Sequence, residues 1–234
     1  MVLDARQTNA FHKAPPFAAM TSPGVMASMV VDDAWDGKAD FNPASLVAGS
    51  VDLCDGLYQS RCKRMGSWFG INFPGCTANG LGISTVYDEA TGKDEAIGPD
   101  EFVWPCFEAL PMGWSWALWV CHETPVDCMA VAARPGDTFA LNRSVAATIS
   151  PDSVVHAPYV DNASLMGMST DTVDDRLDRV TDELTRRGFR WHEHNKAQGC
   201  LEVLGMVVDG AADRLRHKPR RAWRLYRALG FSSA

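Results

Sequence analysis

Residues 51–59 read VDLCDGLYQ and belong to a stretch, 47–58, that predicts a strand running into a glycine-containing corner, with Asp52 near that corner. Residues 154–168 have two short apolar arms around Asp161 and Asn162, whose small polar side chains tolerate tight turns. This second stretch therefore predicts a hairpin. Together the two stretches predict a strand and a hairpin, and each brings an acidic side chain to the end of a strand.

The segments around these stretches predict further helices and strands. Residues 115–131 are strongly apolar and favour a helix that Pro125 kinks or splits. An apolar stripe at helical spacing, with a capping pattern at its start and a glycine at its end, predicts a second helix over about 172–187. Residues 189–194 and 201–208 read as strands. The order strand, helix, hairpin, helix, strand predicts an α/β (α+β) fold with an antiparallel sheet.

Three other stretches complete the chain. Residues 2–19 read as an extended arm that ends in two prolines, and residues 76–99 read as a long loop or hairpin, which is the expected place of an insertion. Pro219 suits the first turn of a last helix that runs to about Leu229.

Composition excludes several classes of protein. The chain has 234 residues with 46% hydrophobic residues and a net charge of −7, which fits a globular unit rather than a disordered chain. No apolar run approaches the roughly 18 residues of a membrane span, and the start does not resemble a signal peptide. A soluble, intracellular protein of the cytoplasm or nucleus is expected. The seven cysteines form no C-x-x-C pair, which disfavours a disulfide framework or a structural zinc site.

The charge is unevenly distributed. Seven basic residues and no acidic residue lie between Arg214 and Arg227, whereas residues 1–212 hold 15 basic and 28 acidic residues, a net of −13. A basic stripe with aromatic residues in it is typical of a contact with a phosphate backbone, although a solvated amphipathic helix is the more common origin of such a pattern.

Asp52 and Asp161 form a candidate metal site. Adjacent strands lie about 4.8 Å apart, so if the first strand neighbours the hairpin, the two carboxylates can share a pair of divalent ions about 3.5 to 4 Å apart. Phosphoryl transfer with two metal ions needs this arrangement, and Mg²⁺ prefers such oxygen ligands. By itself the pattern is weak, because an aspartate at a turn usually only forms the turn.

Six short motifs occur in one order over residues 4–205. They are DARQTN at 4–9, VDLCDGLYQ at 51–59, LPMGWS at 110–115, YVDN at 159–162, Gly188 with Lys196, and Leu204 with Gly205. In this order they resemble the D-x-R-x-x-N segment and motifs A to E of reverse transcriptases of the retroelement, or retrotransposon Pol, type.

The resemblance implies a right-hand polymerase palm with partial fingers over residues 1–212 and a basic start of the thumb over 213–234. It implies RNA-directed DNA polymerisation, in which a primer 3′-hydroxyl attacks the α-phosphate of a deoxynucleoside triphosphate. The partners would be this triphosphate and an RNA or DNA template with its primer, with no membrane. The cofactor would be two Mg²⁺ ions, with Mn²⁺ as an alternative.

The resemblance also implies a role for individual residues. Asp52, Asp161 and Asn162 would hold the metal ions, and Lys196 would be a candidate general acid near the leaving pyrophosphate, although an ordinary exposed loop lysine fits position 196 equally well. Leu204 and Gly205 match the primer grip, for which a simple hairpin in the core is at least as good a reading. The residues expected to bind the nucleotide are Arg6, Asp55, Leu57, Tyr58, Met112, Gly113 and Tyr159.

Three departures from the family pattern leave alternatives open. Asn162 stands where the family has a second aspartate, and Leu57 stands where it has the aromatic residue that excludes a ribose 2′-hydroxyl. The chain also resembles a fragment of a longer polyprotein. One alternative is therefore a catalytically degenerate relic, or a domesticated nucleic-acid-binding module, with the same fold. The other is an unrelated soluble α/β enzyme that depends on a metal.

Overall fold

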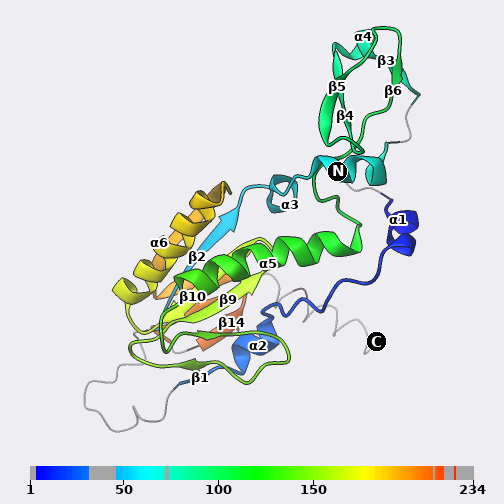
Figure 1. Ribbon diagram of the computed structural model, residues 1–234. Helices are drawn as coiled ribbons and strands as arrows, with labels where there is room; N and C mark the ends of the chain where they lie inside the picture. The colour runs from blue at the N-terminus through cyan, green and yellow to red at the C-terminus, as the bar shows by residue number, and fades with distance from the viewer. Residues whose placement is uncertain (1–3, 32–45, 72–73, 213, 219–223, 225–234) are drawn as a thin grey trace, which may run out of the picture. The chain divides into compact units, whose positions relative to one another are not determined.

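The structure is a computed structural model, and the residues that it describes are 4–31, 46–71, 74–212, 214–218 and 224. Figure 1 shows the elements in chain order. The helices are α1 (Arg6–Phe11), α2 (Pro23–Ala27), α3 (Gly56–Gln59), the 3₁₀ helix η3 (Lys63–Phe69), α4 (Ala78–Leu81), α5 (Ser115–Ala132) and α6 (Thr170–Arg186). The strands are β1 (Val30–Val31), β2 (Val47–Leu53), β3 (Cys76–Thr77), β4 (Thr85–Asp88), β5 (Lys93–Ala96), β6 (Phe102–Val103), β7 (Thr138–Phe139), β8 (Thr148–Ile149), β9 (Val155–Tyr159), β10 (Asn162–Gly167), β11 (Trp191–Gln198), β12 (Cys200–Val203), β13 (Met206–Asp209) and β14 (Arg214–His217).

The chain divides into two compact units. The first, here called the insert unit, comprises residues 1–16 and 55–121, and the second, the sheet unit, comprises 17–54 and 122–234. The insert unit contains α1, α3, η3, α4 and the small strand pairs β3–β6 and β4–β5. Helix α5 contributes its residues through Cys121 to the insert unit and the remainder to the sheet unit.

A five-stranded sheet in the order β11-β2-β10-β9-β7 organises the sheet unit. Neighbouring strands are antiparallel except for β7 and β9, which are parallel. Strand β2 is almost wholly buried, as a central strand is, and it pairs with β10 in a register that sets Asp52 opposite Asn162 and Val47 opposite Gly167. The adjacency on which the expected metal site depends is therefore present.

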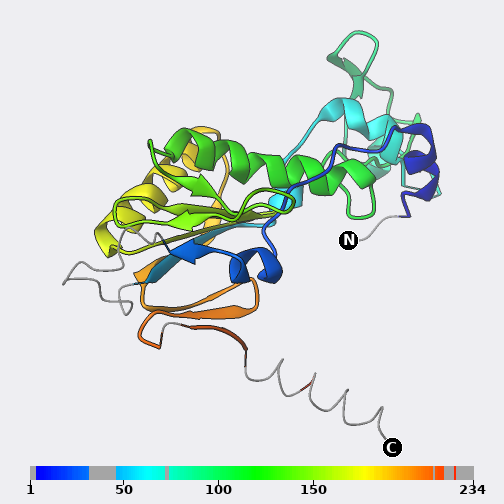
Figure 2. The same cartoon turned by 90° about the horizontal axis from the view of Figure 1, so that it is seen from below.

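The two faces of this sheet bury different side chains, because successive residues of a strand point to opposite sides. Val51 and Leu165 belong to a core cluster with residues of α5 and α6, whereas Ala48 and Met166 belong to a second cluster with residues of β12 and β13. Figure 2 shows the three-stranded sheet β12-β13-β14 on the side of the sheet away from α6. The five-stranded sheet thus forms the middle layer of the unit.

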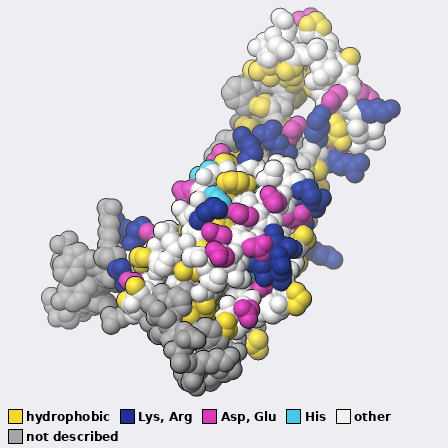
Figure 3. Space-filling model, turned by 90° about the vertical axis from the view of Figure 1, so that its left-hand side faces the viewer, with side chains coloured by type: hydrophobic (Ala, Val, Ile, Leu, Met, Phe, Trp, Pro, Cys, Tyr) yellow, Lys and Arg dark blue, Asp and Glu magenta, His cyan; other side chains and the backbone are white. Residues whose placement is uncertain are grey.

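Helix α6 forms as the apolar stripe predicts. Val173, Leu177, Val180 and Leu184 are all buried, and burial of each stabilises the fold by about 1.5–3 kcal/mol. The first turn differs from the expected capping pair, because Ser169 is the N-cap and its hydroxyl accepts the hydrogen bond from the Thr172 N–H. The outer face of α6 carries interspersed acidic and basic side chains (Figure 3).

Several sequence expectations need correction. Pro125 does not split α5, which runs unbroken over eighteen residues. The arm over residues 2–19 contains the short helix α1. The expectation of a long loop or hairpin over 76–99 is confirmed, because the β4–β5 hairpin lies there. The stretch 201–208 is a hairpin rather than one strand, and, apart from Arg224, the expected last helix lies outside the described residues.

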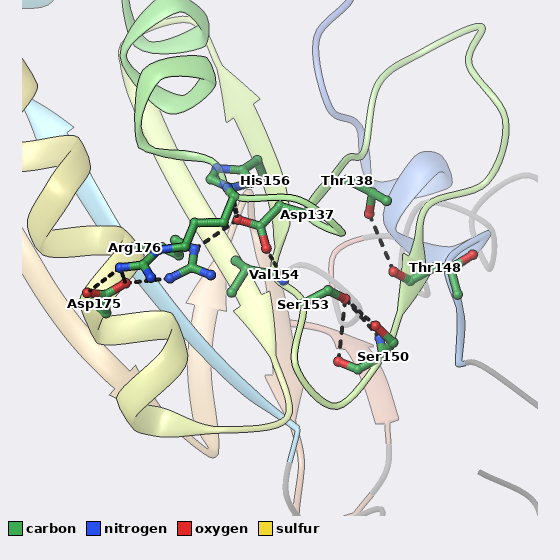
Figure 4. Close-up of polar contacts among 10 residues, drawn as sticks. Asp137, Thr138, Thr148, Ser150, Ser153, Val154, His156, Asp175 and Arg176 are labelled. Carbon is green, nitrogen blue, oxygen red and sulfur yellow. Dashed lines mark hydrogen bonds and ion pairs between the residues drawn. The ribbon is translucent and has the colours of Figure 1, made fainter. Parts of the chain in front are cut away.

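A buried polar network fastens β9 to α6 (Figure 4). The Asp137 side chain is fully buried and accepts hydrogen bonds from the Val154 N–H at 2.9 Å, the Arg134 N–H at 2.8 Å and Arg176 Nε at 2.9 Å. His156 Nε2 lies 3.5 Å from the same carboxylate. Because these partners come from α6, from the loop after α5, and from β9 and the residue before it, this carboxylate fixes the start of β9, the strand that leads to Asp161.

No helix within the described residues is long and apolar enough to cross a membrane.

Candidate active site

The carboxyl end of β2 and the β9–β10 turn meet at one point. Asp52 lies opposite Asn162 across the β2–β10 pair, and the Leu53 N–H donates a hydrogen bond to the Asp161 carbonyl at 3.1 Å. The Cys54 N–H then donates to the Arg190 carbonyl at 3.0 Å, which ties the same end of β2 to the chain before β11. Backbone bonds on both sides therefore hold the acidic positions together.

The side chains of Asp52 and Asn162 share the face of the sheet that is turned away from α6. Val51 and Ala163, their neighbours along the strands, both point into the core beneath α6, so strand alternation directs Asp52 and Asn162 to the other side. The Asp52 side chain keeps 28% of its surface exposed. A carboxylate at this place is open to a polar ligand yet fixed by a rigid strand.

The electrostatics of the site disfavour the ionised form of Asp52. Burial raises the pKa of Asp52, and repulsion from the nearby Asp161 raises it further, while His192 opposes both effects. Two carboxylates that repel each other at the edge of a sheet form a site that a cation stabilises.

The turn between β9 and β10 is tighter than expected. Asn162 is the first residue of β10 rather than part of the turn, and the turn itself is formed by Val160 and Asp161. Val160 has φ +53°, a conformation that costs a β-branched residue free energy and that the surrounding pairing must hold in place. Tyr159, just before the turn, is 43% exposed.

The donor set suits a hard divalent ion only in part. Asp52 and Asp161 supply carboxylate oxygens, and Asn162 supplies an amide oxygen, which are ligands that Mg²⁺ accepts together with water and phosphate oxygens. The Asn162 Oδ1 already accepts a hydrogen bond from the Ser164 hydroxyl at 2.8 Å. Over the described part of the chain, no three His, Cys, Asp or Glu side chains gather as a metal site. A substrate that brings phosphate oxygens would complete the coordination.

His192 is a neighbour of the site that the sequence pattern conceals. Its Nε2 lies 3.9 Å from Asp52 Oδ2, whereas His194 Nε2 lies 3.8 Å from Asp178 on α6. Strict alternation along β11 would send both histidines to one face, but a register shift between Trp191 and Glu193 separates them. The bulge brings His192 to Asp52, and no local pattern in the sequence indicates it.

Lys196 does not lie beside the two aspartates. Its ammonium group is 4.0 Å from Asp178 Oδ2 on α6, and the side chain is 65% exposed. The neighbouring Asn195 is opposite Ser50, which places this part of β11 two residues along β2 from Asp52. The expected role in proton transfer stays a prediction.

Leu204 and Gly205 form the turn of the β12–β13 hairpin. Both have positive φ, +53° for Leu204 and +74° for Gly205, and the hairpin packs on the face of the sheet that carries Asp52. At the other end of this hairpin a Cβ on Gly210 would lie 2.0 Å from the Leu46 carbonyl oxygen, so only glycine fits there.

The insert unit holds the other expected nucleotide-binding residues. Asp55 is the N-cap of α3 with φ +48°, and its carbonyl accepts a hydrogen bond from the Tyr58 N–H at 2.7 Å. The Tyr58 ring makes an edge contact with Phe107 at 5.8 Å, and Leu57 beside it is partly buried. This corner is therefore well ordered by its own contacts.

Asn9 joins α1 to the start of α5. Its side-chain amide donates to the Gly113 carbonyl at 2.9 Å and accepts from the Ser115 N–H at 2.8 Å, so it satisfies a backbone N–H at the first residue of α5. Gly113 has φ +107°, which favours glycine, and Met112 is 41% exposed. The sequence motif contains Asn9, but its role as a clamp emerges only from the fold.

Arg6 lies on the exposed side of α1. Its guanidinium pairs with Asp4, with Nε 2.8 Å from Oδ1, and hydrogen bonding to Asp4 raises the pKa of Arg6. The same bonds lower the pKa of Asp4 to about 2. A phosphate ligand would have to compete with this carboxylate.

Comparisons with known proteins found a similar fold among solved structures and no similar sequence. No protein family matches the sequence, and no curated protein does. Among solved structures, a foamy viral protease–reverse transcriptase in complex with double-stranded DNA is similar to the chain, with a TM-score of 0.54 and 16% sequence identity over 94% of this chain. The chain spans 28% of that protein. At this identity the likeness concerns the fold alone, and the chain therefore shares its mixed α/β fold, with antiparallel sheets, with part of a polymerase-type protein.

Proposed function

We propose that this chain is the polymerase part of a retroelement reverse transcriptase, which extends a primer with deoxynucleotides on an RNA template. The observation that carries the proposal is the register that sets Asp52 opposite Asn162 and ties Leu53 to the Asp161 carbonyl. The order of the sequence motifs and the likeness of the fold to a viral reverse transcriptase support the same reading.

In this proposal Asp52 and Asp161 hold two Mg²⁺ ions. When bound, such ions lower the pKa of an attacking hydroxyl and stabilise the charge that develops on a leaving oxygen. The protein supplies the carboxylates on a rigid strand and turn. The carboxylates therefore need little reorganisation when the ions and the substrate bind. Asn162 contributes an amide oxygen once the Ser164 hydroxyl turns away from it.

The insert unit would bind the nucleotide through Leu57 and Tyr58, the Met112–Gly113 turn and Arg6. Leucine is smaller than the aromatic residue that it replaces, so we expect weaker exclusion of a ribose 2′-hydroxyl at this position. Lys196 and the Leu204–Gly205 turn keep their proposed roles at the pyrophosphate and at the primer, and the basic tail is proposed to contact the backbone of the duplex.

A second candidate function has a specific observation in its favour. Asn162 removes one carboxylate from the site, and the described residues hold no group of three acidic, histidine or cysteine ligands. A chain of this fold that binds a primer–template without extending it would have the same structure. The two candidates differ in one measurable property, which is metal-dependent synthesis.

Primer extension on an RNA template, with Mg²⁺ or Mn²⁺, tests the proposal. We would compare the unmodified chain with Asp52→Asn, with Asn162→Asp, and with Asp182→Asn, a matched charge removal at an exposed position of α6. The proposal expects synthesis by the unmodified chain and by Asp182→Asn, and its loss in Asp52→Asn.

Other outcomes separate the two candidates. Synthesis only in Asn162→Asp would mean that the fold is intact and that the asparagine at position 162 abolishes activity. This result would favour the binding module. Synthesis that survives Asp52→Asn would overturn the assignment of the site. No synthesis by any variant, together with retained duplex binding, would replace the polymerase by the binding module.

A further inference from the structure

The insert unit contains a groove that the proposed polymerase site does not use. Residues of η3, of β4 and of the stretch after β6 line it (Figure 1), and its volume is about 540 Å³. Cavities of about 300–1,000 Å³ have the size that a small ligand or an anchoring side chain fills. We call this surface the acidic groove, and the lining residues that matter here are Val86, Asp88, Glu89, Trp104 and Glu108.

Trp104 forms an apolar wall of the groove and is held in place. Its ring lies against Gly75, where an added Cβ would come within 3.0 Å of two ring atoms, so the glycine allows this close approach. Trp104 is nevertheless 58% exposed, and Val86 in the same groove is 37% exposed. Apolar side chains that are exposed together around a hollow mark an interaction site more often than isolated ones do.

The charge of the groove is negative. Asp88, Glu89 and Glu108 line it, and none of the three forms an ion pair within the described residues. Of the described residues that line the groove, only Lys63 is basic, and its ammonium group is paired with Asp94 at 2.9 Å. Three carboxylates in the lining are therefore left without a cation.

Cys106 lies in the groove and responds to its negative potential. Burial raises the pKa of the Cys106 thiol, and the charges of Glu89 and Glu108 raise this pKa further. A place that disfavours the thiolate anion also repels phosphate groups and attracts cations. The groove therefore suits a ligand that combines positive charge with apolar or aromatic surface, and it does not suit nucleic acid.

The chain itself contains a segment with this chemistry. Residues 219–231 read PRRAWRLYRALGF, with four arginines, three aromatic residues and no acidic residue, and apart from Arg224 they lie outside the described residues. The chain just before them is tied to the sheet unit, because Lys218 pairs with Glu202 at 2.7 Å. An arginine guanidinium can stack on an aromatic ring and pair with a carboxylate at the same time.

We propose that the acidic groove binds residues 219–231 of a second copy of the chain. An arginine of that segment stacks on Trp104 and pairs with the carboxylates of the groove, while an apolar side chain covers Val86. In a dimer of two-fold symmetry each molecule offers its segment to the groove of the other, so the contact occurs twice and the assembly closes. The same segment belongs to the basic tail that is proposed to contact a duplex. Competition between duplex and dimer rests on that proposed function, whereas the dimer itself does not.

Sedimentation equilibrium of the full chain, without nucleic acid, tests the proposal. We expect a dimer at about 0.05 M KCl that dissociates at about 0.5 M KCl, because salt screens the attraction between exposed charges. Trp104→Ala should weaken dimerisation about tenfold and Glu108→Gln about fivefold, since each substitution removes an interaction from both contacts. Phe11→Ala and Asp100→Asn are the matched controls, because both residues are exposed in the insert unit and neither lines the groove.

A synthetic peptide of residues 217–231 tests which part of the second copy is bound. In excess, this peptide should convert dimers of the full chain into monomers. The same peptide with its four arginines replaced by glutamine should leave the dimers intact, because it lacks the guanidinium groups that pair with the groove.

Three results would overturn the proposal. A chain that stays monomeric at about 100 μM in low salt makes no such contact between copies. Dimers of unchanged affinity in Glu108→Gln and Trp104→Ala would assign self-association to another surface, and dimers that the peptide leaves intact would exclude the tail. Glu108→Gln keeps the shape of an exposed side chain, so it stays informative if Trp104→Ala unfolds. Asp52→Asn should dimerise as the unmodified chain does, so failure of the polymerase and failure of the dimer are separate results.

Discussion

Asn162 sets the charge of the candidate active site. It lies directly opposite Asp52 with Asp161 just before it, so one unit of negative charge is absent at the place where a metal ion would bind. A unit charge pair at 4 Å is worth about 4 kcal/mol at an effective dielectric constant of 20, before desolvation reduces it. The residue thus weakens metal binding without removing every oxygen ligand.

We expect Asn162→Asp to bind Mn²⁺ at least about tenfold more tightly than the unmodified chain, because the added carboxylate faces the same cation. Titration followed by electron paramagnetic resonance measures this affinity. Asn195→Asp is the control, because this substitution adds the same charge on β11, at a position opposite Ser50. An equal gain in both variants would show that the effect is general electrostatics and not coordination at the turn.

The sequence identifies some of the important residues and misses others. Asp52 and Asp161 can be predicted because each ends a recognisable strand, and adjacent strands bring such ends together. Asn9 and His192 cannot, because their roles depend on contacts across about 104 residues for Asn9 and on a register shift for His192. No local pattern records a contact of that range or a bulge.

The elements follow the hydrophobic pattern where packing decides them. α6 and the β9–β10 hairpin form as expected, but α5 passes through Pro125, which a single-sequence reading treats as a break. Buried residues on either side, Cys121 and Cys128, keep the helix continuous through their packing. The position of Lys196 could not be predicted from the sequence either, because its pairing with Asp178 depends on how α6 lies against β11.

The network around Asp137 is expected to control the stability of the β9–α6 contact. Asp137→Ala leaves the Arg176 guanidinium, 8% exposed, without its buried partner, and should lower the free energy of unfolding by about 3–5 kcal/mol. Urea denaturation followed by circular dichroism measures the change. Asp175→Ala is the control, because Asp175 is 45% exposed and its removal should cost about 1 kcal/mol or less. Similar losses in both variants would contradict this view of the network.

The same network predicts a dependence of stability on pH. Burial lowers the pKa of His156, and the Arg176 charge lowers it too, while Asp137 opposes both. Because the folded pKa lies below the unfolded value of about 6.5, the unfolded chain takes up the proton first, and stability should fall with acid below about pH 6.5 by up to about 1.4 kcal/mol per pH unit.

Burial also opposes ionisation of Asp137, but the hydrogen bonds from Arg134, Val154 and Arg176 outweigh it and lower its pKa. Its share of stability is therefore lost only below about pH 4. Urea midpoints at pH 7 and pH 5.5 separate the two groups, since His156→Gln should flatten the change between these values. An unchanged slope in this variant would assign the effect to other histidines, such as the buried His122.

At the scale of the whole molecule, the charge distribution limits duplex binding. Of the seven basic residues after Ala212, Arg216 pairs with Asp209 at 3.4 Å and Lys218 pairs with Glu202 at 2.7 Å. If all seven replaced counterions, the slope of log K against log salt on a blunt-ended duplex would be about −6.3, and we expect a slope no steeper than this. Anisotropy titrations over a range of KCl concentrations measure it.

Arg220→Ala combined with Arg221→Ala should reduce that slope by about 2, because two phosphate contacts are lost. Lys93→Ala, in the insert unit far along the sequence from the tail, is the control and should leave it unchanged. A slope that the double substitution does not alter would place the phosphate contacts elsewhere on the protein.

The insertion of residues 55–121 between β2 and its partners has a kinetic consequence. Asn195 on β11 contacts Ser50 on β2 across 145 residues of chain, so a ribosome that adds about 5–20 residues per second needs roughly 7–30 s to supply the last partner of a strand already made. The apolar strand VAGSV has both edges unpaired until β10 is made and one edge unpaired until β11 is made, and unpaired strand edges are the condition under which nascent chains aggregate or recruit chaperones.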